Sequence, residues 1–354
     1  MPSVDDGAVS GRYQVREPSR QDLVKDCHNV PMAPATLSSQ VVDSRPLGAG
    51  GNSGSTVELV TLGDGRELVR KRVSPEWDWM ARLTDDRGRV PALWESGWFD
   101  WLPTAVDHAI VAVEDVDTDG WTLFMRDVSP LLLPGSTRVG ADQVQQILTA
   151  MDGLHAVPPA EPRIELCSLA DRYRLFSPAL ALREAAGGNH HGEIFTRGWD
   201  AFGELVSSEV ADAVPDIADD PAELAARLGR CEQTLVHGDL RLGNLGLTGD
   251  GIVLIDWGER LGLAPPAVEL AWFLGFDAYR LDVPADAVID GWRETCGDRF
   301  DPVALDLALI GALAQLGGII GFWIVNAQDP DERGVYLAHL RWWDARVRVA
   351  LQSW

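Results

Sequence analysis

The sequence predicts an α+β fold of two unequal lobes, a small antiparallel-sheet N-lobe and a larger, mainly helical C-lobe. Three observations support this prediction. Strand-like segments dominate from about residue 41 to 126, and helical segments dominate after Pro134. A short strand-rich island at residues 234–257 then interrupts the helices, which resume and continue to the end of the sequence.

The expected domain boundaries follow from the same changes of pattern. Residues 1–36 are polar and contain several prolines, which predicts an extension outside both lobes. We expect the N-lobe at residues 37–129 and the C-lobe at residues 130–354. At 354 residues the chain is long enough for two domains around a full hydrophobic core.

The N-lobe pattern begins with a glycine-rich turn at residues 45–55 and a strand at residues 56–62. Gly63-Asp64-Gly65 then forms a hairpin turn, and residues 67–73 form the return strand. The remaining elements expected in this lobe are a helix within residues 76–94 and strands around residues 109–113 and 122–126.

The C-lobe pattern begins with a periodic helix at residues 141–155, and helical segments continue through residues 161–229. Residues 307–325 are nineteen residues with Gln315 as their only strongly polar member, a length that could span a bilayer. Four glycines interrupt this stretch and no basic residues flank it. We therefore expect a buried core helix whose glycines permit close contact with a neighbouring helix.

The charge of the chain is strongly negative, with 30 basic against 54 acidic residues and a net charge of −24. Such a surface repels phosphate backbones and anionic lipids, which argues against nucleic acid and membranes as partners and favours cationic small molecules. Only Lys25 and Lys71 are lysines, and the other 28 basic residues are arginines. A lysine retained against this bias is informative.

The cysteines and the N-terminus predict a cytoplasmic protein. Four cysteines are widely scattered, without metal-binding spacing or a dense disulfide pattern. The first forty residues lack a basic region followed by an apolar one, as a secretory signal would have. The sequence does not indicate an oligomeric state.

The most informative stretch delivers polar side chains from short apolar strands. One strand leads into His237 and Asp239, and Asn244 follows five residues after Asp239. A hairpin formed by residues 245–255 then brings Asp256 back beside Asn244. Amide and carboxylate oxygens suit a hard cation such as Mg²⁺ that bridges phosphates, which leaves Asp239 free to orient and deprotonate a hydroxyl.

This arrangement resembles the aminoglycoside phosphotransferase and choline kinase-like family, the small-molecule branch of the protein-kinase-like superfamily. The catalytic-loop pattern H-x-D-x-x-x-x-N is met by His237, Asp239 and Asn244, and the metal-binding element by Asp256-Trp257-Gly258. The resemblance spans about residues 41–350. Two departures occur after the metal loop: Ala264-Pro-Pro in the intervening segment, and Glu269 where many relatives have Asp.

The resemblance implies a protein-kinase-like two-lobe fold and a role for each motif residue. Asp239 is expected to accept the proton of the acceptor hydroxyl, and Asn244 and Asp256 to bind magnesium. His237 is expected to brace the loop by hydrogen bonds. For Arg241 two roles stay open, a contact with the transferring phosphoryl group and a salt bridge of structural value.

The N-lobe should then supply the nucleotide site. Lys71 shares one strand face with Val69 and Val73, which resembles the strand lysine that holds the α- and β-phosphates. An ammonium is a compact point charge that a guanidinium does not mimic, which explains a lysine at this position. The alternative is a surface lysine paired with nearby acids. Its usual glutamate partner is Glu76 or Glu95, and the sequence does not choose between them.

Two further N-lobe segments are candidates for nucleotide contacts. Gly48, Gly50 and Gly51 would form the loop that covers the phosphates, one hairpin before Lys71. Met125 belongs to a strand, residues 123–128, that resembles the one leading into the hinge that contacts adenine through its backbone.

An acidic run in the C-lobe is the candidate acceptor wall, with no basic residue between Arg197 and Arg227. It could bind an amine-bearing acceptor, but we favour the commoner meaning of a charge run, a solvated helix face. We interpret Asn189-His190-His191 as a loop and not as a metal site. The acidic run consists of Asp200, Glu204, Glu209, Asp212, Asp216, Asp219, Asp220 and Glu223.

These inferences predict a phosphotransferase that moves the γ-phosphoryl group of ATP or GTP, with Mg²⁺, to a hydroxyl of a small molecule. Aminoglycosides and other amine-bearing acceptors fit the net charge, and sugars and amino-acid alcohols stay open. The alternative is a nucleotide-binding regulatory or scaffold protein without turnover. Such proteins usually lose the base, the metal ligands or the lysine, and none is lost here.

Overall fold

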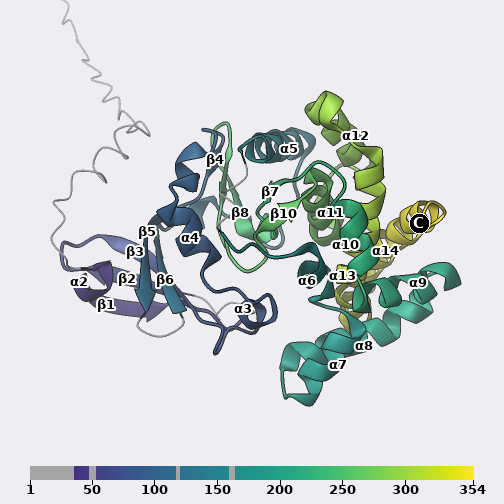
Figure 1. Cartoon of the computed structure of the whole chain (residues 1–354), viewed down its shortest axis with the longest axis horizontal. Coiled ribbons are helices and arrows are strands. Elements are labelled where there is room, and N and C mark those ends of the chain that lie inside the picture. The colour runs from purple at the N-terminus through teal and green to yellow at the C-terminus, as the bar shows by residue number, and fades with distance from the viewer. Residues whose placement is uncertain (1–35, 48–52, 117–119, 159–163) are drawn as a thin grey trace, which may run out of the picture. The chain divides into compact units, whose positions relative to one another are not determined.

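A five-stranded antiparallel sheet forms the N-terminal part of the fold (Figure 1). The structure, a computed structural model, describes residues 36–47, 53–116, 120–158 and 164–354. Residues 41–354 form one compact unit, and helix α2 (Leu37–Gln40) does not belong to it. The strands follow the order β1-β2-β3-β6-β5, with bounds β1 (Val41–Pro46), β2 (Thr56–Leu62), β3 (Glu67–Val73), β5 (Ile110–Val116) and β6 (Gly120–Met125).

The register of this sheet places Lys71 in its centre. Lys71 on β3 pairs with Val57 on β2 and with Leu123 on β6, so it is flanked by strands on both sides. Its side chain and that of Val69 line the main cavity, as the alternation of side chains along a strand predicts. The expected bounds of β2 and β3 are confirmed.

The segment after β3 forms two short helices, where the sequence predicted one within residues 76–94. Helix α3 (Trp79–Leu83) begins at Asp78, whose carboxylate accepts the backbone N–H groups of Met80 and Ala81. Helix α4 (Arg89–Glu95) follows a turn in which Asp85 and Gly88 have φ of 48° and 107°. This left-handed turn separates the two helices.

The strand-rich island forms two small sheets. Strand β8 (Leu245–Leu247) and strand β9 (Ile252–Leu254) form the expected antiparallel hairpin, and β4 (Val106–Asp107) joins β9 in parallel. Strand β7 (Thr234–Val236) pairs with β10 (Gly262–Ala264). Strands β4 and β10 are two and three residues long, too short to produce a periodic signal in the sequence.

Helices make up most of the remaining chain (Figure 1). Helix α5 has the bounds that the sequence predicted. The helices are α5 (Ala141–His155), α6 (Leu169–Arg174), α7 (Pro178–Ala186), α8 (His190–Leu205), α9 (Ser208–Asp219), α10 (Ala222–Leu228), α11 (Pro266–Asp277), α12 (Ala285–Cys296), α13 (Pro302–Asn326) and α14 (Pro330–Leu351). The 3₁₀ turns are η1 (Trp98–Trp101), η2 (Ser129–Leu131), η3 (Leu242–Asn244), η4 (Ala278–Arg280) and η5 (Gly297–Arg299).

Helix α13 is the apolar stretch that the sequence singled out. It is long and apolar enough to cross a membrane, but 78% of its most apolar window is buried inside the protein. Gly317, Gly318 and Gly321 face α8: a Cβ added to Gly198 would lie 1.7 Å from the carbonyl oxygen of Gly318, and one added to Gly321 would lie 2.2 Å from that of Gly198. The expectation of a buried core helix with close glycine contacts is confirmed.

Candidate active site

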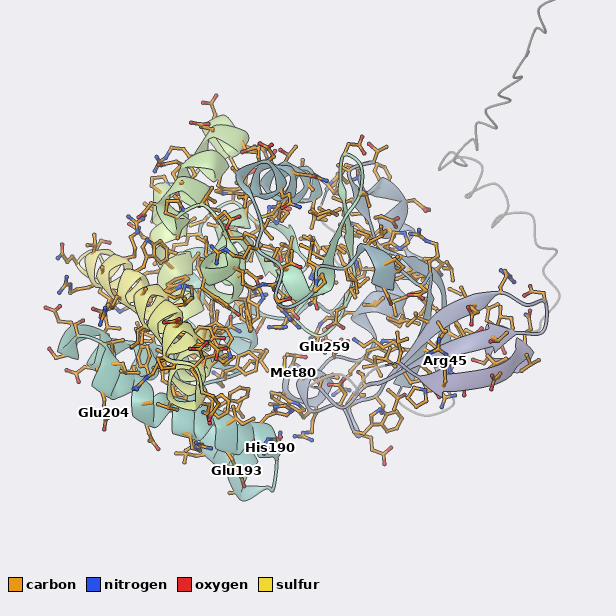
Figure 2. The ribbon with its side chains drawn as sticks, turned by 180° about the vertical axis from the view of Figure 1, so that it is seen from behind. Arg45, Met80, His190, Glu193, Glu204 and Glu259 are labelled. Atoms are coloured by element: carbon orange, nitrogen blue, oxygen red, sulfur yellow. The ribbon has the colours of Figure 1, made fainter. Side chains whose placement is uncertain are left out.

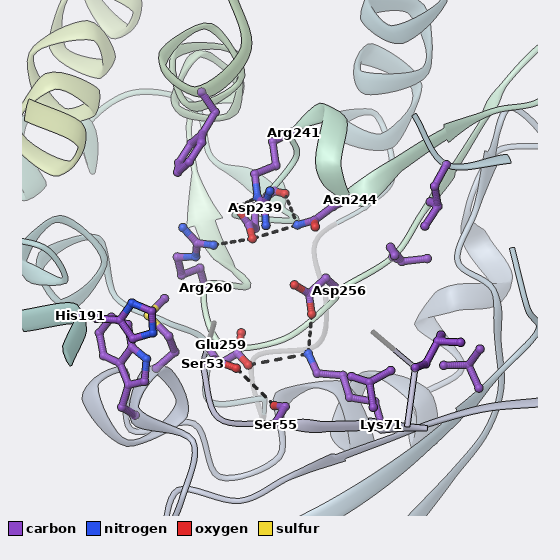
Figure 3. Close-up of a pocket in the computed structure, with 18 of the residues that line it drawn as sticks. Ser53, Ser55, Lys71, His191, Asp239, Arg241, Asn244, Asp256, Glu259 and Arg260 are labelled. Atoms are coloured by element: carbon purple, nitrogen blue, oxygen red, sulfur yellow. Dashed lines mark hydrogen bonds and ion pairs between the residues drawn. The ribbon is translucent and has the colours of Figure 1, made fainter. Parts of the chain in front are cut away.

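One cavity of about 600 Å³ lies between the sheet and the helical part of the fold (Figure 3). Most of the predicted site residues line it. His237 lies behind it, and Gly48, Gly50 and Gly51 fall outside the described residues. The site residues that line the cavity are Lys71, Met125, Asp239, Arg241, Asn244 and Asp256.

The loop after β7 is held by the buried carboxylate of Glu269 on α11. Its Oε2 and Oε1 accept the backbone N–H groups of His237 and Gly238 at 3.0 and 2.8 Å. Nε2 of His155 lies 3.1 Å from Oε2. Burial alone would raise the pKa of Glu269, but the hydrogen bond to His155 outweighs it and the pKa falls to about 2. The glutamate therefore fixes the loop as a charged acceptor.

Gly238 shows why this position excludes a side chain. Its φ is 85°, in the left-handed region that favours glycine. A Cβ there would lie 2.1 Å from the carbonyl oxygen of Arg260. Glycine at position 238 is therefore required by both its backbone conformation and a close backbone contact.

His237 contacts the loop through its own ring. Its Nδ1 accepts the backbone N–H of Asp239 at 3.1 Å, which requires a ring without a proton on that nitrogen. Burial lowers the pKa of His237, in agreement with a neutral imidazole. The ring packs edge-on against Trp257, with the centroids 4.5 Å apart.

The carboxylate of Asp239 is surrounded by four donors, of which Figure 3 labels Arg241, Asn244 and Arg260. Oδ1 accepts the indole N–H of Trp272 at 2.9 Å and lies 3.3 Å from Nε of Arg241. Oδ2 accepts Nδ2 of Asn244 at 2.9 Å and lies 2.5 Å from Nη2 of Arg260. The candidate base is thus held in one orientation by groups from three parts of the chain.

Arg260 and Trp272 were not predicted from the sequence. Both are buried, and the guanidinium of Arg260 lies 4.3 Å from the centre of the Trp272 ring. Arg260 follows Asp256 by four residues, on the chain that leaves the metal loop. No motif spacing in the sequence marks either residue as a partner of Asp239.

Arg241 forms a salt bridge to Asp239 and its guanidinium lies 5.5 Å from the centre of the Phe276 ring. Burial would lower its pKa, but the neighbouring carboxylates, Asp239 foremost, outweigh burial and raise it. The salt bridge and the cavity-lining position are both present, so neither predicted role of Arg241 is excluded.

Asp256 lies beside Asn244 because Ile255 donates its backbone N–H to the carbonyl oxygen of Asn244 at 2.9 Å. Asp256 itself has φ of 65°, a left-handed conformation that is strained for a residue with a side chain. Its Oδ1 accepts a hydrogen bond from Nζ of Lys71 (Figure 3). The low-dielectric surroundings oppose ionisation of Asp256, but Lys71 outweighs them and holds the pKa of the carboxyl below its ordinary value.

The partners of Lys71 differ from those that the sequence suggested. Nζ pairs with Asp256 and lies 4.0 Å from Glu259, so neither Glu76 nor Glu95 is its ion-pair partner in the part of the chain that the structure describes. The two carboxylates outweigh burial and raise the pKa of Lys71. Burial raises the pKa of Glu259 to about 7.

The residues present fit a hard divalent cation. Nδ2 of Asn244 donates to the carbonyl oxygen and to Oδ2 of Asp239, at 3.0 and 2.9 Å, which leaves its Oδ1 as the ligand atom. Asp256 supplies a carboxylate. Within the described ranges no group of three or more His, Cys, Asp or Glu side chains could hold a metal. A cation bound by two protein ligands and completed by phosphate oxygens and water is typical of Mg²⁺.

The end of the cavity around Met125, which ends β6, is apolar. Ser53 and Ser55, at the described end of the glycine-rich segment, both donate to the carboxylate of Asp78 that caps α3. This network ties the described end of that segment to α3. The apolar residues that line this end are Leu47, Val57, Val69, Met125, Val128, Leu132 and Ile255.

The acidic run lies away from the cavity. All eight of its carboxylates are exposed, and none lines the cavity. Figure 2 shows Glu204 on α8, apart from Met80 and Glu259, which lie where the sheet faces the helices. The interpretation as a solvated helix face therefore fits the structure better than an acceptor wall.

The sequence predicted a loop at Asn189-His190-His191, and this prediction is wrong. Asn189 caps helix α8, since its side chain accepts the backbone N–H of His191 at 3.0 Å, and the two histidines form the first turn. His191 lines the cavity and lies 5.5 Å from the Trp79 ring in a stacked arrangement.

A central strand lysine paired with a metal-loop aspartate, and a second aspartate held in a loop beside an asparagine, define a protein-kinase-like phosphotransferase site. The two-lobe fold agrees with this class. The chain belongs to the phosphotransferase enzyme family, whose family model matches residues 45–306. No curated protein matches the chain.

Several solved structures are similar to this chain at low identity. A microcompartment-associated aminopropanol kinase is 16% identical with a TM-score of 0.48, and the match covers 88% of this chain and 93% of that one. A choline kinase from Cryptosporidium parvum Iowa II is 13% identical with a TM-score of 0.47, covering 95% and 97%. A thermostable mutant of an aminoglycoside phosphotransferase is 15% identical with a TM-score of 0.45, covering 87% and 95%. These likenesses say nothing about the acceptor of this chain.

Proposed function

We propose that the protein transfers the γ-phosphoryl group of ATP or GTP to a hydroxyl group of a small molecule. The observation that carries this proposal is that Lys71, Asp239, Asn244 and Asp256 line one cavity. A cation, two metal-ligand oxygens and a fixed carboxylate are the parts that phosphoryl transfer requires, because its catalysis is mainly positioning and charge stabilisation.

At the nucleotide end, Lys71 would hold the phosphates and Met125 would lie beside the base. Gly48, Gly50 and Gly51 would cover the phosphates. Asn244 and Asp256 would hold Mg²⁺, which when bound neutralises charge on the phosphate oxygens. In the structure Lys71 pairs with Asp256. We expect this ion pair to break when the nucleotide binds, because Lys71 would then bind the phosphates and Asp256 would bind the metal.

At the acceptor end, Asp239 would orient the hydroxyl and receive its proton as the new oxygen–phosphorus bond forms. The oxygen that bridged the β- and γ-phosphates leaves with the nucleoside diphosphate. The four donors on Asp239 restrict its movement, which supports positioning more than strong basicity. Arg241 would stabilise charge on the transferring group, and His237 would brace the loop.

The remaining assignments are proposals of the same kind. Residues 37–129 would form the nucleotide-binding lobe and residues 130–354 the catalytic and acceptor-binding lobe, with residues 1–36 as an extension. We propose a cytoplasmic enzyme that acts on a free small molecule and does not bind nucleic acid or a membrane.

A coupled assay of nucleotide consumption, with purified protein and a panel of hydroxyl acceptors, tests the proposed function. We expect consumption of ATP or GTP that requires both Mg²⁺ and an acceptor. Mass spectrometry of the product should show one added phosphoryl group. Nucleotide binding without consumption, with every acceptor in the panel, would instead favour a regulatory or scaffold protein.

A further inference from the structure

A second group of cavity-lining residues has a different character from the group around Met125. Its members are apolar and aromatic side chains from helices α3, α8, α11 and α13 and from the segment before α7. The residues that form this acceptor end are Trp79, Met80, Phe176, Ile194, Phe195, Phe276, Ile319, Phe322 and Trp323. We use "acceptor end" below for this set.

The aromatic rings of the acceptor end contact one another. Trp79 on α3 lies 6.1 Å from Phe195 on α8, and Phe195 lies 5.0 Å from Phe176, between ring centroids. On the α11 and α13 side, Phe276 lies 5.7 Å from Trp323. Rings packed in this way form a preformed apolar surface, which binds an apolar molecule without first being ordered.

The charges around the acceptor end do not favour a cation. Four carboxylates line the whole cavity: Asp127, Asp239, Asp256 and Glu259. Asp239 pairs with two arginines, and Asp256 and Glu259 lie against Lys71. Asp127 follows β6, at the nucleotide end. In this structure an ammonium group bound among the aromatic side chains would therefore have to share a carboxylate that already lies within 4.0 Å of a cation of the protein.

One aromatic ring of the acceptor end is also partly occupied by a cation of the protein. The guanidinium of Arg241, which lines the cavity, lies 5.5 Å from the centre of the Phe276 ring. A ring face that already holds a guanidinium attracts a second cation less strongly. This arrangement disfavours a quaternary ammonium acceptor as well as a polyamine.

We propose that the acceptor is a hydroxyl compound with an apolar, ring-containing scaffold and no net positive charge. The inference rests on the proposed function and narrows its substrate class. It replaces the amine-bearing acceptor that the net charge of the chain suggested, because the surface that produces this charge does not line the cavity.

The first arm of the test compares acceptors. Phosphoryl transfer is measured for ring-containing neutral alcohols, for amine-bearing alcohols of similar size including an aminoglycoside, and for choline. We expect kcat/KM for the best neutral alcohol to exceed that of every cationic acceptor by at least about 100-fold. A cationic acceptor with the highest kcat/KM overturns the proposed substrate class and leaves the phosphotransferase function intact.

The second arm changes the wall itself. Phe322→Ala should raise the KM of the neutral acceptor by about tenfold or more without changing the KM of the nucleotide. Phe322→Glu should shift the preference towards amine-bearing acceptors, since it supplies a further carboxylate. Leu182→Ala, at a side chain on α7 that is 59% exposed, is the control and should change neither KM. An unchanged acceptor KM in both Phe322 variants contradicts the proposal.

The third arm separates this inference from the proposed function. Binding of the same compounds is measured by calorimetry with the wild-type protein, whether or not turnover is seen. Binding of neutral apolar compounds that Phe322→Ala weakens, without any transfer, supports the acceptor class and contradicts the phosphotransferase function. Absence of both binding and transfer overturns both proposals.

Discussion

The two ends of the cavity are built in different ways. At the end proposed to bind the nucleotide, Lys71, Asn244 and Asp256 come from strands and from the turns that follow them. Lys71 forms an ion pair with Asp256, and Asn244 donates a hydrogen bond to Asp239. At the acceptor end the walls are apolar and aromatic side chains from four helices and from the segment before α7. Under the proposed function, the transfer chemistry therefore depends on a few fixed spacings in the sequence, whereas acceptor recognition depends on how the helices pack.

The largest expected effect separates chemistry from binding at Asp239. Asp239→Asn should lower kcat by about 10³-fold, because the amide cannot accept the hydroxyl proton. The dissociation constant of the nucleotide should change little, since the nucleotide end is untouched. Stopped-flow kinetics measures kcat, and calorimetry measures the dissociation constant of the nucleotide. Full activity in this variant would remove Asp239 from the mechanism.

The second prediction compares two neighbours on β3. Lys71→Arg should raise the nucleotide KM by about ten- to hundredfold, because hydrogen bonds from a charged donor contribute about 1.5–3 kcal/mol. Arg72→Lys, on the exposed face of the same strand, is the matched control and should leave the KM unchanged. Equal effects of the two substitutions would mean that Lys71 acts only through the stability of the sheet.

The third prediction concerns Glu269, which holds the loop that carries Asp239. Glu269→Gln should lower the free energy of unfolding by about 1–3 kcal/mol, because the amide leaves one buried backbone N–H of the loop without an acceptor. Chemical denaturation monitored by tryptophan fluorescence measures this difference. We expect kcat to fall as well, since the loop carries Asp239.

The difference in unfolding free energy between the wild type and Glu269→Gln should depend on pH, and the sign of that dependence follows from the pKa of Glu269. The folded-state pKa of Glu269 is about 2, below its ordinary value of 4.5. Its contribution is therefore fully present above pH 4.5 and is lost as the pH falls towards 2. The stability difference between wild type and Glu269→Gln should shrink over that interval. A difference that does not change with pH would show that Glu269 is not ionised in the folded protein.

The smallest expected effect tests the exposed acidic run. The triple substitution Glu204→Gln, Asp212→Asn, Asp216→Asn should change kcat and both KM values by less than about twofold, because isolated surface substitutions contribute about 0.5 kcal/mol or less. A large rise in acceptor KM would mean that the run binds the acceptor after all. It would also contradict the assignment of acceptor recognition to the aromatic walls.

Much of the fold could be predicted because its signals are local. The alternation in residues 56–62 and 67–73 and the periodicity of residues 141–155 gave the bounds of β2, β3 and α5. Strand β4 could not be predicted, since its two residues form a strand only through their pairing with β9. Helix α8 begins at His190 because Asn189 caps it. The sequence did not predict this start, since the first helical residues are two histidines and a glycine, which are weak helix formers.

The site was predictable to the extent that motifs place residues at fixed spacing. His237, Asp239, Asn244 and Asp256 belong to one continuous stretch, whose hairpin brings them together. Arg260 does not belong to such a motif. Its role as a partner of Asp239 follows only from the distance between the two side chains.

For Lys71 the sequence predicted the position of the residue but not its ion-pair partners. Its strand position was evident, but its partners, 185 and 188 positions further along the chain, were not. The resemblance suggested a glutamate closer in the chain, Glu76 or Glu95. Glu259 lies 4.0 Å from Nζ of Lys71 instead.

The contact between the glycines of α8 and α13 limits how acceptor preference can change over evolution. Ile194 and Phe195 lie one turn before Gly198, and Phe322 and Trp323 directly follow Gly321, so both walls are attached to helices whose backbones touch. Neither helix can shift to enlarge the cavity without separating this contact. New acceptors would therefore arise by exchange of wall side chains on an unchanged backbone, and any substitution at the glycines would be selected against for folding before it could alter specificity.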